Sequence, residues 1–282
     1  MFRPTALLLL TLLASACSRP TQEDLSTQDT LRVVLVAPST AANLVAMGLE
    51  DIIVGVSDYC TDPALQDRPR VGGLADPNLE RIAQLAPTLV LVQGNTPSLE
   101  KYCQQANIPY RAFHTDTLAL WESEVQWLGE HLQRETQAEE LIASLRGVFT
   151  TLTEARAIDA SPLPRVLIVA SRRPGEAGGI LAVGPGGFLD ELLTIAGGQN
   201  VLHDGERAYV DLAEEALFTL LPEVILELES PDENPLATWQ RDFPSLPAVQ
   251  NNKVLALKGE DLLMPGPGMG RVASAIAQLL SE

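Results

Sequence analysis

The sequence is poor in basic residues. It contains 19 lysines and arginines against 37 aspartates and glutamates among 282 residues, giving a formal net charge of −18 and a pI near 4.5. A surface that follows a phosphate backbone needs the opposite sign, so this composition argues against nucleic-acid binding. Hydrophobic residues make up 46% and charged residues 20%, which indicates a folded rather than a disordered chain.

Histidine is also scarce, and the motifs of common exported enzymes are missing. His114, His131 and His203 lie far apart in the sequence, whereas a protein that binds a bare transition-metal ion needs several such ligands together. Residues 55–59 lack the final glycine of a nucleophile elbow, no HExxH occurs, and residues 184–187 are not followed by the Lys-Ser/Thr of a phosphate loop. We therefore predict a non-enzyme with no catalytic residues, no metal site and no cofactor.

The N-terminus has the pattern of an export signal over residues 1–16. Arg3 supplies the positive charge, residues 6–13 form an apolar run too short to span a bilayer, and residues 14–16 are small, as at a cleavage site. An uncleaved anchor or a buried strand are the alternative interpretations.

The segment Leu13-Ala14-Ser15-Ala16-Cys17 resembles a bacterial lipobox, whose cysteine becomes the lipidated first residue of the mature protein. Residues 17–30 are polar, contain Pro20 and lack a periodic apolar pattern, which predicts a flexible tether. The resemblance implies a membrane-anchored lipoprotein of the periplasm or outer cell surface.

Cysteine is the third scarce residue type, with three in the chain. Once Cys17 is assigned to lipidation, Cys60 and Cys103 remain as an even pair in an exported protein, where disulfides persist. We predict that they form a disulfide. Two separate buried thiols are the alternative.

From Leu31 onward, short apolar runs alternate with helical patterns. Strands are predicted at 32–36, 52–56, 88–92 and 109–112, and helices at 41–49, 78–86 and 98–106. The first run, Arg-Val-Val-Leu-Val, is continuous and β-branched, as in a strand buried on both faces. The alternation predicts a parallel sheet in an α/β lobe over residues 31–116.

Residues 117–160 have a different pattern. They contain no proline, glycine appears only at 129 and 147, and apolar residues recur at helical spacing. One long helix, with room for one break, is predicted. Forty residues of helix would extend about 60 Å, enough to join two lobes.

The alternation resumes after residues 161–164, which contain two prolines. Strands are predicted at 166–170, 223–228 and 254–257, and helices at 188–196, 212–220 and 270–280. A second α/β lobe is therefore predicted over residues 161–282.

A short internal repeat supports this division. Residues 79–91 align with residues 214–226 without a gap, and each segment predicts a helix, a proline turn and a buried strand. Glu80 and Glu215 lie seven residues before the proline in each copy and so occupy equivalent first turns. Stabilisation of a helix dipole is a simpler explanation for both glutamates, and so short a match can also arise by chance.

Several segments together resemble the substrate-binding components of ABC importers for ferric siderophores, haem and cobalamin, over nearly all of the chain from Leu31 onward. They are Val54–Cys60, Val71–Gly73, Asn78–Ile82, Pro87–Leu91, and Phe188–Leu193 with Ala196–Asn200. The resemblance implies two Rossmann-like α/β lobes with mostly parallel sheets, joined by one long rigid helix, with the ligand in the cleft between the lobes.

The same resemblance implies how the protein delivers its ligand. Members of this family dock on the importer's transmembrane subunits through one glutamate per lobe, which pairs with arginines of those subunits. Glu80 and Glu215 correspond to these glutamates. The expected partners are thus the transmembrane subunits and a metal-chelate or corrinoid ligand, with the protein acting as a monomer.

Candidate ligand-binding residues also follow from the resemblance. Tyr59 corresponds to a cleft tyrosine of the family and could serve as an axial ligand of haem, and Tyr209 lies where cobalamin binders carry a tryptophan. Leu74 and Gln93 lie where two further tryptophans are expected, which weakens the case for cobalamin. Gln93 remains a candidate for contact with the ligand.

Arg172 and Arg173 are the other ligand-binding candidates. They are predicted in a loop that follows a strand of the second lobe, and guanidinium groups pair well with carboxylates and anionic chelates. A solvated loop is the simpler interpretation. An exported scaffolding lipoprotein without a ligand cleft, or a direct transition-metal binder of related fold, are the alternative functions.

Overall fold

The structure is a computed structural model that describes residues 31–158, 161–172, 179–230, 234–259 and 262–281. These residues belong to one compact unit. Cys17, the signal segment and the tether lie outside the described residues, as does Arg173. No helix among the described residues is both long enough and apolar enough to cross a membrane.

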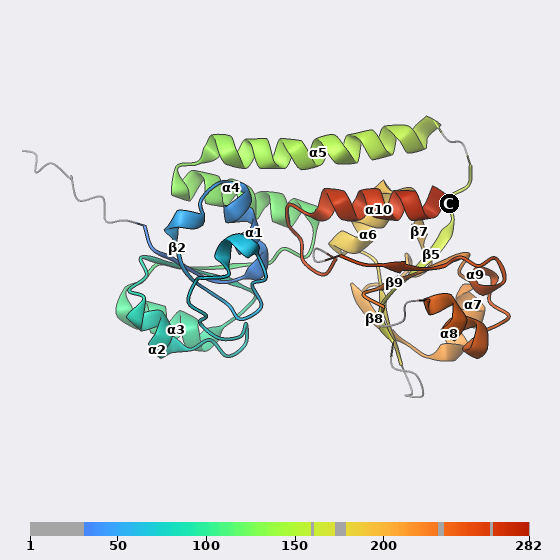
Figure 1. Cartoon of the computed structure of the whole chain (residues 1–282), viewed down its shortest axis with the longest axis horizontal. Helices are drawn as coiled ribbons and strands as arrows, with labels where there is room; N and C mark the ends of the chain where they lie inside the picture. Colours follow the sequence, from blue (N-terminus) through green and yellow to red (C-terminus); the bar gives the residue numbers. More distant parts are fainter. Residues whose placement is uncertain (1–30, 159–160, 173–178, 231–233, 260–261, 282) are drawn as a thin grey trace, which may run out of the picture. The chain divides into compact units, whose positions relative to one another are not determined.

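The first lobe is built on a parallel sheet, as predicted (Figure 1). Its strands are β1 (Val33–Val36), β2 (Ile53–Val56), β3 (Leu89–Gln93) and β4 (Tyr110–Phe113), in the order β2-β1-β3-β4. Helices α1 (Pro38–Ala46), α2 (Leu79–Gln84) and α3 (Pro97–Ala106) cover it. Alternate residues of β1 enter two different hydrophobic clusters, so the sheet is buried on both faces.

Within the predicted segment 117–160, the described residues form two helices rather than one. α4 (Leu118–Leu132) ends at Gln133, whose φ of 55° lies in the left-handed region, and α5 (Glu135–Ile158) then turns back to pack on α4. A side chain at Gly129 would collide with Ala138, so glycine permits the close approach of the helices. The 24 residues of α5 extend about 36 Å. In chain order α5, and not α4, is followed by the first strand of the second sheet (Figure 1).

The second lobe has a mixed sheet in the order β10-β9-β5-β6-β8. β5 (Arg165–Arg172), β9 (Val224–Leu228) and β10 (Val254–Leu257) are parallel, while β6 (Ile180–Val183) and β8 (Tyr209–Leu212) are antiparallel neighbours and β7 (Gln199–Asn200) pairs with β5. The sequence analysis missed β6 to β8. The helix predicted at 212–220 is instead the end of β8, a 3-10 turn η3 (Glu214–Ala216) and the short helix α7 (Leu217–Leu220).

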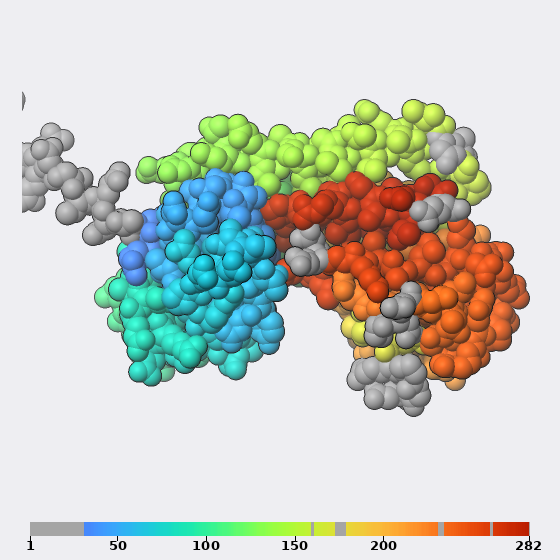
Figure 2. All heavy atoms as spheres, viewed as in Figure 1, coloured from blue at the N-terminus to red at the C-terminus, as the bar shows by residue number. Residues whose placement is uncertain are grey.

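The remaining helices surround this sheet. They are α6 (Phe188–Ile195), α8 (Pro235–Asp242), α9 (Pro247–Gln250) and α10 (Met269–Ser281). α10 lies beside α5, and Figure 2 shows the red atoms of α10 directly against the light-green atoms of α5. Between β10 and α10 the chain reaches the first lobe, where the Ser39 hydroxyl donates to the Pro265 carbonyl.

The internal repeat seen in the sequence extends to the strand order. β1, β3 and β4 form a parallel set that corresponds to β5, β9 and β10. In the first lobe, Arg32 before β1 donates from Nη2 to the Leu85 carbonyl at the end of α2, over 2.7 Å. The Arg32 backbone NH donates to Thr88 Oγ1 over 2.9 Å.

The second lobe repeats these contacts at the aligned positions. Arg165 Nη2 donates to the Leu220 carbonyl over 2.7 Å, and the Arg165 backbone NH donates to Glu223 Oε2 over 2.8 Å. Ala86 and Leu221, which precede the aligned prolines, both have positive φ angles, 43° and 46°. Each lobe therefore holds its helix and proline turn by the same arginine clamp, defined as these contacts of Arg32 and Arg165.

The predicted disulfide is wrong. Cys60 and Cys103 are free, buried thiols. Cys60 belongs to the cluster that contains Val33 and Leu35, whereas Cys103 packs with Val34 and Val36 on the other face of β1. The sheet separates the two sulfur atoms, and the alternative of two separate buried thiols is confirmed.

Thiol titration will check this separation. Burial raises the pKa of Cys60, and it raises the pKa of Cys103 to about 11. Protein in which Cys17→Ser removes the third thiol should react slowly with a thiol reagent at pH 8 when folded, since the thiolate is the reactive form. After unfolding without reductant, both thiols should react. An unfolded protein with no reactive thiol would contradict the structure.

A buried polar cluster joins α1 to α4. Asn43 Nδ2 donates to Glu124 Oε1 over 3.1 Å, and Trp121 Nε1 donates to Asn43 Oδ1 over 2.9 Å. Glu124 is only 2% exposed, and burial raises its pKa from 4.5 to about 7. In the folded protein Glu124 therefore takes up a proton more readily than in the unfolded chain.

This shift predicts a pH-dependent stability. Between pH 4.5 and 7 the folded state keeps the proton on Glu124 while the unfolded chain loses it, so the free energy of unfolding should fall as pH rises through this window. The decrease should be about 3 kcal/mol at most. Urea unfolding of wild type and of Glu124→Gln will measure it, and the variant should lack this component. Equal slopes in both proteins would contradict the assignment.

Candidate functional site

A cavity of about 110 Å³ brings together side chains from both lobes. Gln93 at the carboxyl end of β3 and Asp116 after β4 come from the first-lobe side, and Tyr209 at the start of β8 comes from the second. Leu263 and Pro265 arrive on the segment between β10 and α10. The structure thus places the predicted residues Gln93 and Tyr209 in one cavity. The other lining residues are Val183, Gly187, Phe188, Leu189 and Ala208.

Hydrogen bonds donated by backbone NH groups hold this region together. The Phe188 NH at the start of α6 donates to the Asp116 carbonyl over 2.8 Å. The Leu118 NH donates to Glu191 Oε2 over 2.7 Å, so the first turn of α4 is joined to α6. Because these bonds connect residues more than 70 positions apart, the walls of the cavity are fixed by tertiary contacts.

The cavity is lined by polar groups from both lobes and carries a negative charge. Burial, and to a lesser extent the neighbouring Asp116, raise the pKa of Tyr209, so its phenol is neutral and able to donate a hydrogen bond. Tyr209 is 43% exposed, which leaves the ring surface open to a ligand. Among the described lining residues, Asp116 carries the only formal charge. This arrangement suits a flat ligand with an apolar face and polar edge groups.

Tyr59 lies apart from this cavity in the described structure. It follows the carboxyl end of β2, is 62% exposed, and its ring lies next to Gly73. Its phenol is therefore open to a ligand or to solvent, but it does not line the cavity of Gln93 and Tyr209. Leu74 packs partly buried against the hydrophobic cluster of the first lobe.

Arg172 differs from the expectation of a solvated loop residue, since it is the last residue of β5. Its Nε lies 2.8 Å from Glu227 Oε1, its Nη1 lies 3.6 Å from Asp242 Oδ2, and its guanidinium carbon is 5.3 Å from the centre of the Trp239 ring. Its side chain is 10% exposed. The guanidinium is thus already held by acidic and aromatic partners within the second lobe.

Glu227 is the centre of that cluster. Besides Arg172, it accepts hydrogen bonds from Ser230 Oγ over 2.7 Å and from Trp239 Nε1 over 3.0 Å. The cluster borders a cavity of about 370 Å³ at the carboxyl ends of β5 and β9. The contacts of Glu227 indicate that it has a structural role at this end of the sheet.

Glu80 and Glu215 are both exposed, as docking residues need to be. Glu80 lies in the first turn of α2, where the Asn78 side chain caps the helix by accepting from the Arg81 NH. Glu215 lies in the 3-10 turn η3 that leads into α7. The two glutamates are equivalent in the repeat, although the local turns differ.

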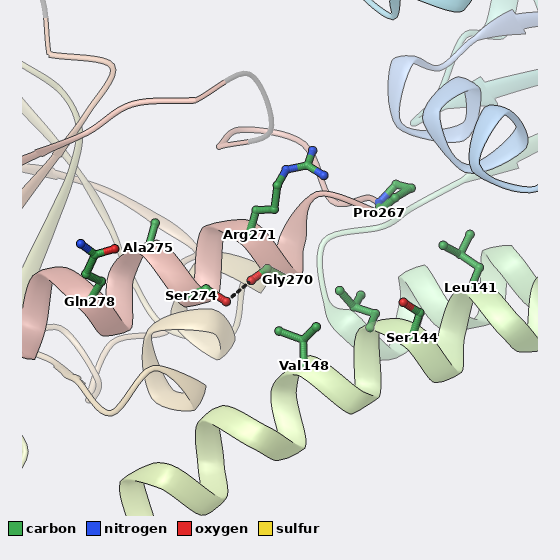
Figure 3. Close-up of a pocket in the computed structure, with 10 residues that line it drawn as sticks. Leu141, Ser144, Val148, Pro267, Gly270, Arg271, Ser274, Ala275 and Gln278 are labelled. Atoms are coloured by element: carbon green, nitrogen blue, oxygen red, sulfur yellow. Dashed lines mark hydrogen bonds between the residues drawn. The ribbon is translucent and has the colours of Figure 1, made fainter.

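A further groove lies between α5 and α10, with a volume of about 450 Å³ (Figure 3). Leu141, Ser144 and Val148 of α5 face Gly270 and Ser274 of α10 across it. These residues are small or apolar and provide no group of convergent charges. Within the described ranges, no three His, Cys, Asp or Glu side chains are grouped so as to hold a metal ion.

A family model described as periplasmic binding protein matches residues 33–260. The chain belongs to the periplasmic binding protein family. Among curated members, high-affinity heme uptake system protein IsdE of Staphylococcus aureus (strain Newman) is 28% identical over 265 residues, which cover 90% of this chain and 88% of IsdE.

Solved structures agree on the two-lobed periplasmic binding protein fold. Heme-binding protein HutB of Vibrio cholerae superposes with a TM-score of 0.79 at 19% identity, covering 90% of this chain and all of HutB. Vitamin B12 binding protein BtuF of Vibrio cholerae superposes with a TM-score of 0.73 at 24% identity, covering 89% of this chain and 96% of BtuF. The family expected from the sequence is therefore confirmed.

Sequence reasoning missed Asp116, Leu263 and Pro265 in the cavity. Asp116 follows β4, and the rule that ligands of open α/β sheets lie beyond the carboxyl ends of the strands was a usable signal for it. Leu263 and Pro265 had no local signal, because only the path of the chain between β10 and α10 brings them there.

The Arg172–Glu227 pair predicts a large loss of stability on disruption. Glu227→Leu would leave the buried guanidinium without its nearest carboxylate, and we expect the free energy of unfolding to fall by about 3 kcal/mol or more. Arg172→Met combined with Glu227→Leu should recover most of the loss. Urea unfolding measures both.

The matched control is Glu122→Gln, which removes the partner of Arg146 in an exposed pair. Water screens that pair, so its loss should change stability little. An equal effect of Glu227→Leu and Glu122→Gln would refute the structural role of Glu227.

Proposed function

We propose that this protein is the substrate-binding component of an ABC importer and captures an iron chelate or corrinoid, with haem as the first candidate, outside the cytoplasm. The observation that carries the proposal is the cavity that joins Gln93, at the carboxyl end of β3, and Asp116, after β4, to Tyr209 of the second lobe, since ligands of open α/β sheets bind beyond the carboxyl ends of the strands. It has no catalytic role in the proposal, and its established relatives are binding proteins of transport systems.

Haem is the first candidate. IsdE, whose name gives haem uptake as its role, matches 90% of this chain. Tyr59 offers an exposed phenol, and a tyrosinate oxygen is a suitable axial ligand for ferric iron. The ring of Tyr209 would add stacking and apolar contact with the macrocycle.

A corrinoid is the second candidate, and one observation favours it. The described lining of the cavity offers a neutral amide, a neutral phenol and a carboxylate, and among these lining residues there is no arginine or lysine to pair with an anionic edge group. Such a lining accepts neutral amide donors well. A ferric siderophore is the third ligand class in the proposal.

The cavity of about 110 Å³ is too small to enclose any of these ligands. We therefore assign it to one edge of the ligand. Arg172 has a positioning role and does not contact the ligand in this proposal, because Glu227 and Asp242 already hold its guanidinium. Arg173 stays a proposal from the sequence alone.

The proposal includes the membrane steps. Cleavage of residues 1–16 and lipidation of Cys17 would anchor a monomer to the membrane through the tether of residues 17–30. Glu80 and Glu215, one exposed glutamate per lobe, would then pair with arginines of the importer's transmembrane subunits. Labelling with a radioactive fatty acid should mark wild type and spare Cys17→Ala.

Ligand titration tests the binding role. Tryptophan fluorescence and visible absorbance should be followed as haem, cobalamin and ferric siderophores are added. We expect saturable quenching by one class, with haem the first candidate. Tyr209→Ala should weaken that binding about tenfold through lost stacking, and Tyr59→Phe should change the visible spectrum of bound ferric haem. Tyr102→Phe, in the first-lobe cluster, is the control. Silence across the panel would overturn the ligand assignment.

Charge reversal tests the docking role. Glu80→Lys combined with Glu215→Lys should abolish ligand uptake by cells while the ligand affinity of the purified protein stays unchanged. The control is Glu139→Lys with Glu154→Lys, which changes the net charge equally on exposed positions of α5. Uptake by the Glu80/Glu215 variant at the wild-type rate would refute the docking assignment.

A further inference from the structure

The two copies of the internal repeat differ on their outer surface. The arginine clamp and the proline turn recur at aligned positions, so each residue from Leu79 to Ala86 has a counterpart from Glu214 to Leu221. Ala83 corresponds to Phe218, and Ala86 corresponds to Leu221. The first lobe thus has two small side chains where the second lobe has two large apolar ones.

The large side chains are exposed. Phe218 is 49% exposed and Leu221 is 48% exposed. The inner part of the Phe218 ring contacts the lobe, since its centre lies 6.4 Å from that of Phe243. The ring is therefore held in place with its outer part in solvent. Two large, exposed apolar side chains three residues apart, at the end of one short helix, mark a surface that another molecule covers.

Folding does not account for the leucine at position 221. Its φ of 46° lies in the left-handed region, where glycine and asparagine are favoured and a leucine is strained. About half of Leu221 is exposed to solvent, and this part contributes no burial free energy to the folded chain. Both its conformation and its exposure would be improved by another residue, which indicates a use outside the folded monomer.

The charges next to Phe218 and Leu221 indicate which kind of molecule covers them. Glu214 and Glu215 are exposed in η3, immediately before α7. An apolar patch next to two carboxylates suits a protein surface with basic and apolar side chains. It does not suit a membrane surface, whose anionic lipids would repel the glutamates. Aromatic residues at the centre of a charged rim are the usual form of an interface that contributes binding energy.

We infer that Phe218 and Leu221 make an apolar contact with the importer's transmembrane subunits, and that this contact exists only in the second lobe. We call these two residues the second-lobe patch. The inference rests on the proposed function and adds to it. Glu80 and Glu215 give each lobe a charged docking contact, whereas the second-lobe patch adds an apolar contact in the second lobe alone. Docking through the second lobe is therefore the stronger of the two.

Docking affinity on a reconstituted permease tests the inference. Candidate permease–ATPase complexes in lipid nanodiscs are first screened with wild-type protein, and the complex whose ATPase activity it stimulates is used. Phe218→Ala with Leu221→Ala, which copies the first lobe, should dock at least about tenfold more weakly. Its haem or cobalamin affinity should be unchanged.

Three further variants separate docking from folding. Leu221→Asn suits the left-handed conformation, so it should raise the thermal midpoint slightly and still weaken docking. Leu120→Ala removes a leucine of α4 that is similarly exposed, at 43%, and should dock as wild type does. Ala83→Phe with Ala86→Leu, made in the protein that already carries Phe218→Ala and Leu221→Ala, adds a similar patch to the first lobe. We expect that this protein still docks weakly.

The outcomes are distinct. Wild-type docking by both the double variant and Leu221→Asn would overturn the inference while the glutamate docking stands. A wild-type dimer in sedimentation that becomes a monomer in the double variant would assign the patch to self-association and also overturn it. If wild type stimulates no permease, the proposed function itself fails. Weak docking by Leu221→Asn in a stable, ligand-binding protein is the result expected.

Discussion

Parallel pairing of strands is the constraint on which the rest of this structure depends. When β1, β3 and β4 lie parallel, and β5, β9 and β10 do the same, all of their carboxyl ends lie at one edge of each sheet. Each return connection must then cross a face of the sheet, which buries both faces and gives the strands their continuous apolar sequences. Polar side chains collect at the free carboxyl edge, as Gln93 does at the last position of β3.

The same constraint produces the similarity between the lobes. A helix that returns between parallel strands must end close to the next strand, and an arginine at the start of the first strand of each set holds that end through a carbonyl oxygen in both lobes. A residue with positive φ and a proline then redirect the chain. Because this geometry is shared, Glu80 and Glu215 occupy equivalent positions of the repeat, and side-chain differences such as Ala83 against Phe218 can be compared.

Buried polar groups serve the connections between elements. Glu124, Asn43 and Trp121 join α4 to α1, and Glu227 holds Arg172 against Trp239 at the end of the second sheet. Burying any of these polar groups alone would cost free energy, so each is buried together with its hydrogen-bond partners. This is why an arginine that suits an anionic ligand by its chemistry is instead occupied within the lobe.

The sequence by itself determined the α/β class, the first sheet and the proline-turn repeat, because these follow from the spacing of apolar residues and from local turn chemistry. Through the family resemblance it also proposed Gln93, Tyr209, Glu80 and Glu215 as site residues, and the structure has the first two in one cavity and the two glutamates exposed. Tertiary structure decided the rest. The break at Gln133 and the antiparallel strands β6 and β8 depend on which neighbours are available to pack, and the cysteines are separated by a sheet that spacing does not reveal. Asp116, Leu263 and Pro265 meet only because distant connections converge, and no local pattern encodes that convergence.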